Sequence, residues 1–355
     1  MHERPKKRKN PLRGGAALCL SALLLFPILS GTASAENQSG SLTSVDRLVP
    51  VGHTIGIKMF ARGILVIGLS EGDTPARKGG LRKGDVVLHC SGITVESTEQ
   101  FQNLLQNSDG KPLSMEIQRG GIVKKLSVQP KKNENGVYTI GAWIRDSMAG
   151  IGTMTFYDPD TGAFGALGHG INDPDTGALM PFSKGSILPS TVKAVKRGKA
   201  GEAGELRGDF DLETDLGELN ANTEGGVFGV LAPGEYTERL GKAIPVAENS
   251  QVKTGKATIL SNVHGDTVEE YQVEITKVLS QSTDGRNLLI TVTDPALLRD
   301  TGGIVQGMSG SPILQNGRIV GAVTHVLVND PTCGYGILIR NMLENATPQI
   351  SENVS

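Results

Sequence analysis

A serine stands on a glycine-rich turn near the end of the 355-residue chain. Residues 307–312 (GMSGSP) run directly into the apolar pair at 313–314, and Asn316 and Gly317 then turn the chain back. A serine hydroxyl on a sharp turn, with free backbone N–H groups beside it, can act as a nucleophile in acyl transfer. The alternative is that glycine and serine only fill a turn before a hairpin. Ser309 is therefore the candidate nucleophile, and the rest of the chain must supply its base.

The base of a serine hydrolase is normally a neutral imidazole. His169 ends a short strand-like segment and is flanked by Gly168 and Gly170, which leaves its ring accessible. It precedes Ser309 by 140 residues, a spacing that suits a base and a nucleophile on two small barrels. His325 is the alternative base. If it is not the base, it could form a wall of the site or lie in the core. The other histidines lie in less suitable contexts: His2, His53, His89 and His264.

The carboxylate that fixes the imidazole is harder to choose. Asp294 precedes Ser309 by 15 residues, and Pro295 biases it toward an extended conformation that helps to aim its side chain. The alternative role for Asp294 is to cap a turn before Pro295. Three aspartates nearer to His169 in sequence are rivals for the role of the acid: Asp209, Asp211 and Asp215.

Composition favours a chain of short strands. Aromatic residues make up only 4% of the chain and there are 47 glycines, so tight turns are more plausible than a helical bundle. The formal charge of -2 hides an asymmetry, because residues 1–35 carry six basic side chains against one acid. The remaining residues hold 29 basic and 36 acidic side chains, a formal charge of about -7. Nucleic-acid binding gains no support from this balance.

The first 35 residues have the pattern of an export signal. A basic start is followed by an apolar run over residues 16–29 and by Ala33 and Ala35 at the spacing of a cleavage site. We expect residues 1–35 to be a signal peptide or, alternatively, a membrane anchor, and residues 36–50 to be a polar linker.

Residues 51–130 form one compact unit by their pattern. A short apolar strand at 63–68 precedes a stretch with Gly79, Gly80, Leu81, Gly84 and Asp85, and an amphipathic helix follows over residues 98–105. This pattern resembles a bacterial PDZ domain. The resemblance implies that a peptide adds to a sheet edge and that its carboxylate, or an internal segment, meets a backbone loop. That loop would consist of Thr54, Ile55, Gly56 and Ile57. The alternative is a unit that packs on its neighbour and binds no free peptide.

Residues 131–355 are predicted to form a second, β-rich domain. The turn sequence DPDTGA occurs at 158–163 and again at 173–178, and one short strand lies between the two copies. Strands are expected at 226–231, 257–261, 267–278 and 288–293, a helix at 338–344, and a long exposed loop at 193–209.

The turn around Ser309 resembles the nucleophile turn of chymotrypsin-like peptidases. The resemblance implies that the N–H groups of Gly307 and Ser309 form the oxyanion hole, although Ser311 replaces a glycine of the digestive enzymes. It also implies a mainly β chain, in which a PDZ domain precedes a chymotrypsin-like double β-barrel.

Four segments together resemble the stage IV sporulation protein B family: residues 150–157, 164–170, 291–295 and 307–313. The family implies a catalytic set of His169, Asp294 and Ser309. It further implies an enzyme exported across the forespore inner membrane into the intermembrane space. There it would cleave itself and a membrane-bound inhibitory partner, which leads to activation of a late mother-cell sigma factor.

Other classes remain open. A quality-control protease of the periplasmic type carries its PDZ domain after the peptidase domain, and an inactive PDZ adaptor would not need His169 and Ser309. No cofactor and no metal site is expected, because His89 and Cys90 lack further ligands at suitable spacing. The expected partners are protein substrates at a membrane complex, the chain itself and a peptide at the PDZ-like unit.

Overall fold

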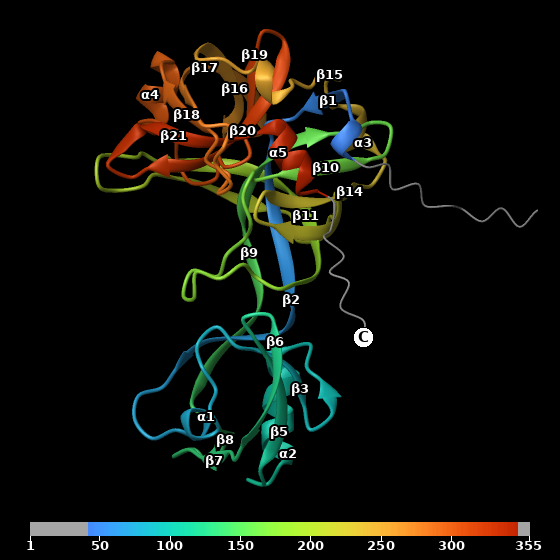
Figure 1. Cartoon of the computed structure of the whole chain (residues 1–355), viewed down its shortest axis with the longest axis vertical. Coiled ribbons are helices and arrows are strands. Elements are labelled where there is room, and N and C mark those ends of the chain that lie inside the picture. Colours follow the sequence, from blue (N-terminus) through green and yellow to red (C-terminus); the bar gives the residue numbers. More distant parts are fainter. Residues whose placement is uncertain (1–41, 347–355) are drawn as a thin grey trace, which may run out of the picture. The chain divides into compact units, whose positions relative to one another are not determined.

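The computed structural model describes residues 42–346, so the predicted signal peptide or anchor at 1–35 lies outside the described residues. The chain is mainly β, as predicted, with strands in a 13-stranded sheet, a closed six-stranded barrel and a small two-stranded sheet (Figure 1). Within residues 42–346, no helix is long and apolar enough to cross a membrane.

The PDZ-like unit is built from the second half of one long strand, β2 (Thr54–Leu69), and the elements after it. Its core is a separate apolar cluster that includes Ile64, Phe101, Met115 and Ile140. The elements are α1 (Pro75–Lys78), β3 (Val86–Cys90), β4 (Ile93–Thr94), α2 (Thr98–Asn107), β5 (Leu113–Arg119), β6 (Ile122–Val128), β7 (Lys131–Lys132) and β8 (Tyr138–Thr139).

The residues that suggested a PDZ domain serve its local turns. Thr74 caps α1 and accepts a hydrogen bond from the Arg77 N–H at 3.3 Å, with Pro75 in the first helical turn. Asp85 is buried, and Arg119 donates to both of its oxygens at 2.6 and 2.7 Å. A buried carboxylate needs such partners, so this pair explains the aspartate of the motif.

The first half of β2 does not belong to the PDZ-like unit. Thr54, Ile55 and Ile57 are buried. Residues 54–57 pair with β9 (Ala142–Tyr157) on one edge, and residues 55–57 pair with β11 (Phe182–Lys196) on the other. The prediction that Thr54, Ile55, Gly56 and Ile57 form a peptide-binding loop is therefore wrong, because a segment paired on both edges has no free groups for a peptide.

The chain before β2 is also structured. Residues 47–50 form β1 (Arg47–Pro50), whose Leu48 and Val49 are buried and which pairs with β9 and with β15 (Ile244–Pro245). The predicted linker at 36–50 is thus wrong over its last residues, and its first residues, to 41, lie outside the described residues. A short 3-10 helix, η1 (Leu42–Ser44), precedes β1.

The large sheet continues through the first part of the peptidase region. Its order is β15-β1-β9-β10-β14-β13-β11-β2-β3-β5-β6. β2 and β9 pair from Thr54–Thr153 to Leu69–Ala142, with shifts in register, so the PDZ-like elements lie between two strands of one long hairpin. The remaining elements are β9 (Ala142–Tyr157), β10 (Ala163–Ala166), β11 (Phe182–Lys196), β12 (Glu205–Phe210), β13 (Gly217–Thr223), β14 (Gly226–Leu231), α3 (Glu235–Glu238) and β15 (Ile244–Pro245).

The closed barrel occupies the C-terminal third of the chain, in orange and red (Figure 1). Its core includes Ile259, Val273, Ile290, Ile313 and Val323. The elements are η2 (Asn249–Gln251), β16 (Gly255–His264), β17 (Thr267–Val278), β18 (Leu288–Val292), α4 (Pro295–Thr301), β19 (Pro312–Gln315), β20 (Arg318–Leu327), β21 (Asp330–Leu338) and α5 (Ile339–Glu344). Asn316 and Gly317 have positive φ and connect β19 to β20, as the hairpin signal predicted.

The strands predicted at 226–231, 257–261, 267–278 and 288–293 and the helix predicted at 338–344 are present, and each end differs from its prediction by three residues at most. The predicted exposed loop at 193–209 is wrong at both ends, because β11 and β12 pair there from Ser190–Phe210 to Lys196–Glu205, and only residues 197–204 connect the two strands. Glycines and charges on a solvent-facing hairpin gave it the composition of a loop.

Candidate active site

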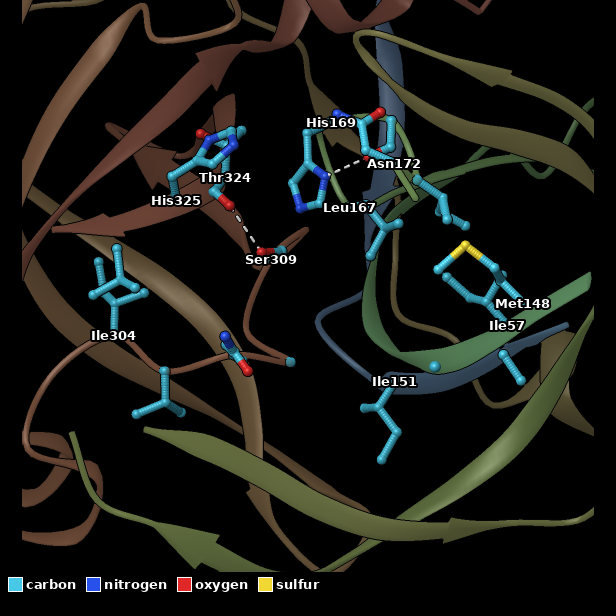
Figure 2. Close-up of a pocket in the computed structure, with 18 residues that line it drawn as sticks. Ile57, Met148, Ile151, Leu167, His169, Asn172, Ile304, Ser309, Thr324 and His325 are labelled. Atoms are coloured by element: carbon cyan, nitrogen blue, oxygen red, sulfur yellow. Dashed lines mark hydrogen bonds between the residues drawn. The ribbon is translucent and has the colours of Figure 1, made fainter. Parts of the chain in front are cut away.

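Ser309 lies on the turn between α4 and β19, as the sequence predicted. Gly307 and Gly310 on either side have φ values of +98° and +99°, a region that residues with a side chain rarely adopt. The Ser309 hydroxyl donates a hydrogen bond to the backbone carbonyl of Thr324 at 2.8 Å (Figure 2). The Ser309 side chain, the candidate nucleophile, therefore rests against β20 (Arg318–Leu327) in this structure.

The large sheet holds this turn from the other side. On β9, Thr153 donates from its N–H to the Ser309 carbonyl at 2.9 Å and from Oγ1 to the Gly307 carbonyl at 2.7 Å. A Cβ on Gly310 would lie 1.9 Å from the Thr153 carbonyl oxygen. Gly310 thus permits the close approach that brings the barrel's serine to the sheet.

The proposed oxyanion donors are available. The Gln306 carbonyl accepts the Leu206 N–H at 2.8 Å, and the N–H of a trans peptide points away from its carbonyl, so the Gly307 N–H faces away from Leu206. Within residues 42–346, neither the Gly307 nor the Ser309 N–H donates a backbone hydrogen bond. Both residues line the same pocket, where the amides can meet a substrate oxyanion.

His169 reaches the pocket from a tight corner of the large sheet. Leu167 and Gly168 both have φ of 69°, and Leu167 is one of only a few residues other than glycine with positive φ in the described chain. This uncommon backbone turns the chain out of β10 directly before the histidine. Figure 2 shows the His169 ring and the Ser309 hydroxyl on facing walls of the pocket.

A backbone carbonyl orients the His169 ring. His169 Nδ1 lies 2.9 Å from the Gly170 carbonyl oxygen, which can only accept, so Nδ1 carries the proton and Nε2 is left as the base. Burial lowers the pKa of His169, and the Gly170 carbonyl opposes part of that shift. The imidazole is therefore neutral at pH 7 and ready to take a proton.

His325 forms the second imidazole of the site. Its ring centre lies 5.1 Å from that of His169, with the planes tilted by 37°. Burial, and then the nearness of His169 and Arg286, lowers the pKa of His325 to about 4. His325 is accordingly neutral at pH 7, and it is the wall of the site that the sequence offered as its alternative role.

Asp294 does not lie with these groups. Its carboxylate caps α4, accepting from the N–H groups of Ala296 at 2.9 Å and Leu297 at 3.1 Å, and from Gln272 at 3.2 Å. It is absent from the residues that line the pocket around Ser309. The structure does not bring Asp294 to His169, because three backbone donors hold its side chain at the helix N-terminus. The alternative role weighed from the sequence, a cap before Pro295, is the one that the geometry supports.

The rival aspartates are elsewhere as well. Asp209 lies on β12, paired with Thr191, and Asp211 accepts hydrogen bonds from Glu213 and Thr214 in its own turn. Asp215 lines a different surface pocket. None of the three lines the pocket of His169 and Ser309.

The arrangement can perform acyl transfer. When the Ser309 hydroxyl rotates from the Thr324 carbonyl toward His169, Nε2 can take its proton as Oγ attacks a carbonyl carbon. The negative charge on the oxygen then faces the Gly307 and Ser309 amides, and the protonated imidazole returns its proton to the leaving amine. Among the described residues, no group of three metal-binding side chains is present.

Sequence reasoning missed the groups that support this chemistry. The Gly170 carbonyl, Thr153 and the Thr324 carbonyl act through backbone geometry or across the sheet, which no short motif signals. Residues 150–157, one of the segments that carry the family resemblance, contain Thr153, but nothing in them indicates its hydrogen bonds to the Ser309 turn.

Comparison with known protein families agrees with this site. A model of the SpoIVB peptidase S55 family matches residues 136–343, and a PDZ domain model matches residues 69–119. The PDZ match starts well after the predicted boundary at residue 51, in agreement with the place of the first half of β2 in the peptidase sheet.

Similarity to individual proteins is partial. A protein of Clostridium perfringens named as a zinc metalloprotease (CPE1693) is 36% identical over 132 residues, which are 33% of this chain and 39% of that protein. A protein of Lactococcus lactis named likewise (LL2128) is 36% identical over 98 residues, 28% of this chain and 21% of that protein. The chain thus spans well under half the length of these relatives.

Among solved structures, the inactive form of the Rv3671c protease aligns with 55% of this chain and 82% of its own, with 13% identity and a TM-score of 0.31. A PDZ domain of an SdrC-like protein (Lmo2051) from Listeria monocytogenes aligns with 23% of this chain and 87% of its own, with 19% identity and a TM-score of 0.22.

The SpoIVB peptidase model covers more than half of the chain, and its span contains both Ser309 and His169. The chain therefore belongs to the SpoIVB peptidase S55 family and is a serine peptidase that carries a PDZ domain.

Proposed function

We propose that this chain is an exported serine endopeptidase of sporulation signalling. It cleaves itself and a membrane-associated regulatory protein, and that cleavage leads to activation of a late mother-cell sigma factor. The observation that carries the proposal is the pocket in which a neutral His169 faces Ser309 beside two free amides. Family membership supports the link to sporulation.

The strand next to Ser309 supports a polypeptide substrate. β20 pairs with β21 through His325 and Val326, whereas its pairing with β19 ends at Ala322. One edge of residues 324–326 is therefore without a strand partner in the described chain, and these residues line the pocket. An extended substrate segment can add to such an edge and present its carbonyl to Ser309.

The N-terminal sequence supports export. The basic start, the apolar run over residues 16–29 and the small residues at 33 and 35 suit translocation across the forespore inner membrane into the intermembrane space. Whether the segment is then removed or kept as an anchor decides if the enzyme acts in solution or on the membrane surface.

Self-cleavage offers the direct test. The full chain and its Ser309→Ala variant are expressed with a C-terminal tag in an endospore-forming host, and the N-termini of the products are sequenced. We expect that only the chain with the intact serine is cut at sites beyond the signal cleavage point. Only that chain should also reduce the amount of an intact membrane-bound substrate. Identical products from both chains would contradict self-cleavage and would favour an adaptor or a quality-control enzyme.

A further inference from the structure

The pocket that holds the catalytic residues has an apolar and uncharged wall. Its volume is about 420 Å³, and no aspartate, glutamate, lysine or arginine is among its described lining residues. His169 and His325 are the only titratable side chains there, and burial lowers the pKa of both. The apolar lining side chains are Ile57, Met148, Ile151, Leu167, Ile171, Ile304, Val305, Val326 and Ala149.

The direction of the reaction divides this wall into two sides. The leaving amine must receive its proton from His169, so the segment that departs lies on the His169 side. Figure 2 shows Leu167 and Met148 on that side of Ser309 and Ile304 on the other. The acyl segment, which stays bonded to Ser309, therefore faces Ile304.

The acyl side is rigid as well as apolar. Ile304 and Val305 are 2% and 1% exposed and belong to the barrel core, and Val326 packs against the same core. Close-packed core side chains cannot move aside to admit water to a charged group. A lysine or glutamate side chain placed there would lose its hydration without gaining a partner, which strongly disfavours its binding.

We infer that the enzyme selects an uncharged aliphatic side chain on the acyl side of the scissile bond, and that Ile304, Val305 and Val326 form the selecting surface. This inference rests on the serine peptidase function and adds the substrate class. It sets the chain apart from peptidases that read a basic residue with a buried carboxylate.

Peptidyl diphenyl phosphonates test the inference on the purified protein. Ser309 Oγ forms a bond to phosphorus, one bond from phosphorus to a phenoxy oxygen breaks, and the serine proton passes through His169 to the departing phenol. One series carries valine, leucine, lysine or glutamate analogues at the position bonded to phosphorus. We expect valine and leucine reagents to label Ser309 at least about 100-fold faster than lysine and glutamate reagents.

The outcomes separate the two claims. If no reagent labels Ser309, the peptidase function itself fails. If the lysine or glutamate reagent labels Ser309 as fast as the valine reagent, the function stands and the aliphatic preference is overturned.

A matched pair of variants locates the selecting surface. Val326 lies in the pocket, whereas Val328, two residues later, is 46% exposed and lies outside it. We expect Val326→Asp to slow the valine reagent by about tenfold or more and to bring the lysine reagent to at least the same rate. Val328→Asp should leave both rates unchanged. The role of Val326 would be overturned if the ratio of valine to lysine labelling rates stayed unchanged in a folded Val326→Asp, or if Val328→Asp changed it equally. If Val326→Asp does not fold, the reagent series on the unmodified enzyme still decides the aliphatic preference.

Discussion

The two β units that meet at the active site are built in different ways. The barrel that carries Ser309 uses strands from one continuous stretch, β16 to β21, and most neighbours in its order are also neighbours in sequence. The sheet that carries His169 takes β2 from ahead of the PDZ-like elements and places it between β11 and β9. The barrel is a local structure, whereas the sheet is completed only by a strand from a distant part of the chain.

The different origin of the strands shows that the peptidase sheet begins before the PDZ-like elements. The PDZ-like elements follow β2 and precede most of the peptidase domain, but they are inserted in the β2–β9 hairpin, so the first half of β2 belongs to the peptidase sheet. The residues before the insertion, β1 and the first half of β2, therefore belong to the same sheet as His169.

The largest effect is expected from deletion at the predicted domain boundary. Removing residues 51–130 takes β2 out of the large sheet, leaves both β9 and β11 with an unpaired edge, and should abolish folding and peptide hydrolysis. Circular dichroism and hydrolysis of a short aliphatic peptide measure the two effects.

The matched control removes the insertion alone. Phe60 pairs with Ser147, so a short glycine linker between Arg62 and Arg145 can replace residues 63–144 and close the hairpin. This shorter chain should fold and hydrolyse the short peptide. If both deletions behave alike, β2 is not the strand that completes the catalytic sheet.

The second prediction concerns the contact between sheet and barrel. Gly310→Ala places a Cβ against the Thr153 carbonyl at a φ that disfavours alanine, so the two units must separate. We expect at least a 100-fold fall in kcat/KM, equal to about 2.7 kcal/mol of transition-state stabilisation. Gly241→Ala, where the added Cβ meets nothing within 4 Å, serves as the control. Equal activity in the two variants would show that the close approach is not needed.

The third prediction uses the two copies of the DPDTGA turn. Asp158 accepts hydrogen bonds only within its own turn, whereas Asp173 also forms an ion pair with Arg145 on β9. Asp173 lies four residues after His169, so this pair ties the histidine's loop to the β2–β9 hairpin. Asp173→Asn should lower the free energy of unfolding by about 1–2 kcal/mol, less than for a fully buried ion pair because Arg145 reaches solvent. It should also lower kcat/KM a few-fold. Thermal unfolding of Asp158→Asn, expected to change less, provides the comparison.

The smallest effect on turnover is expected at Asp294. Asparagine can cap a helix as well as aspartate, so Asp294→Asn should retain turnover within about threefold, while Asp294→Ala should lose about 1 kcal/mol of stability. A loss of several orders of magnitude in a stable Asp294→Asn would restore this residue as the acid that orients His169. Turnover rates measured alongside for Asp209→Asn, Asp211→Asn and Asp215→Asn test the three rival aspartates.

The sequence predicted the parts of the site that depend on local pattern. Ser309, its glycine turn and the β19–β20 hairpin are specified within about 20 residues, and His169 stands out by its flanking glycines. The place of β2 could not be predicted, because the sequence resemblance to a PDZ domain and the actual strand pairing assign residues 54–57 differently. The sequence could not place Asp294 for a related reason: an aspartate before a proline suits both an extended catalytic acid and an N-cap, and only the position of α4 shows that its side chain caps that helix in this structure.

The central claim is that a neutral His169, held by the Gly170 carbonyl, activates Ser309. Its most direct test is the pH dependence of Ser309 labelling by the valine phosphonate, with the labelled residue identified by mass spectrometry. Because burial lowers the pKa of His169 and the neutral form is the base, labelling should be fast at pH 7 and fall as the pH drops, with its midpoint below 6.5. His169→Ala should abolish labelling, and Asp294→Asn should leave both the rate at pH 7 and the midpoint nearly unchanged. A rate that does not depend on pH between about 4 and 8, or on His169, would contradict the account.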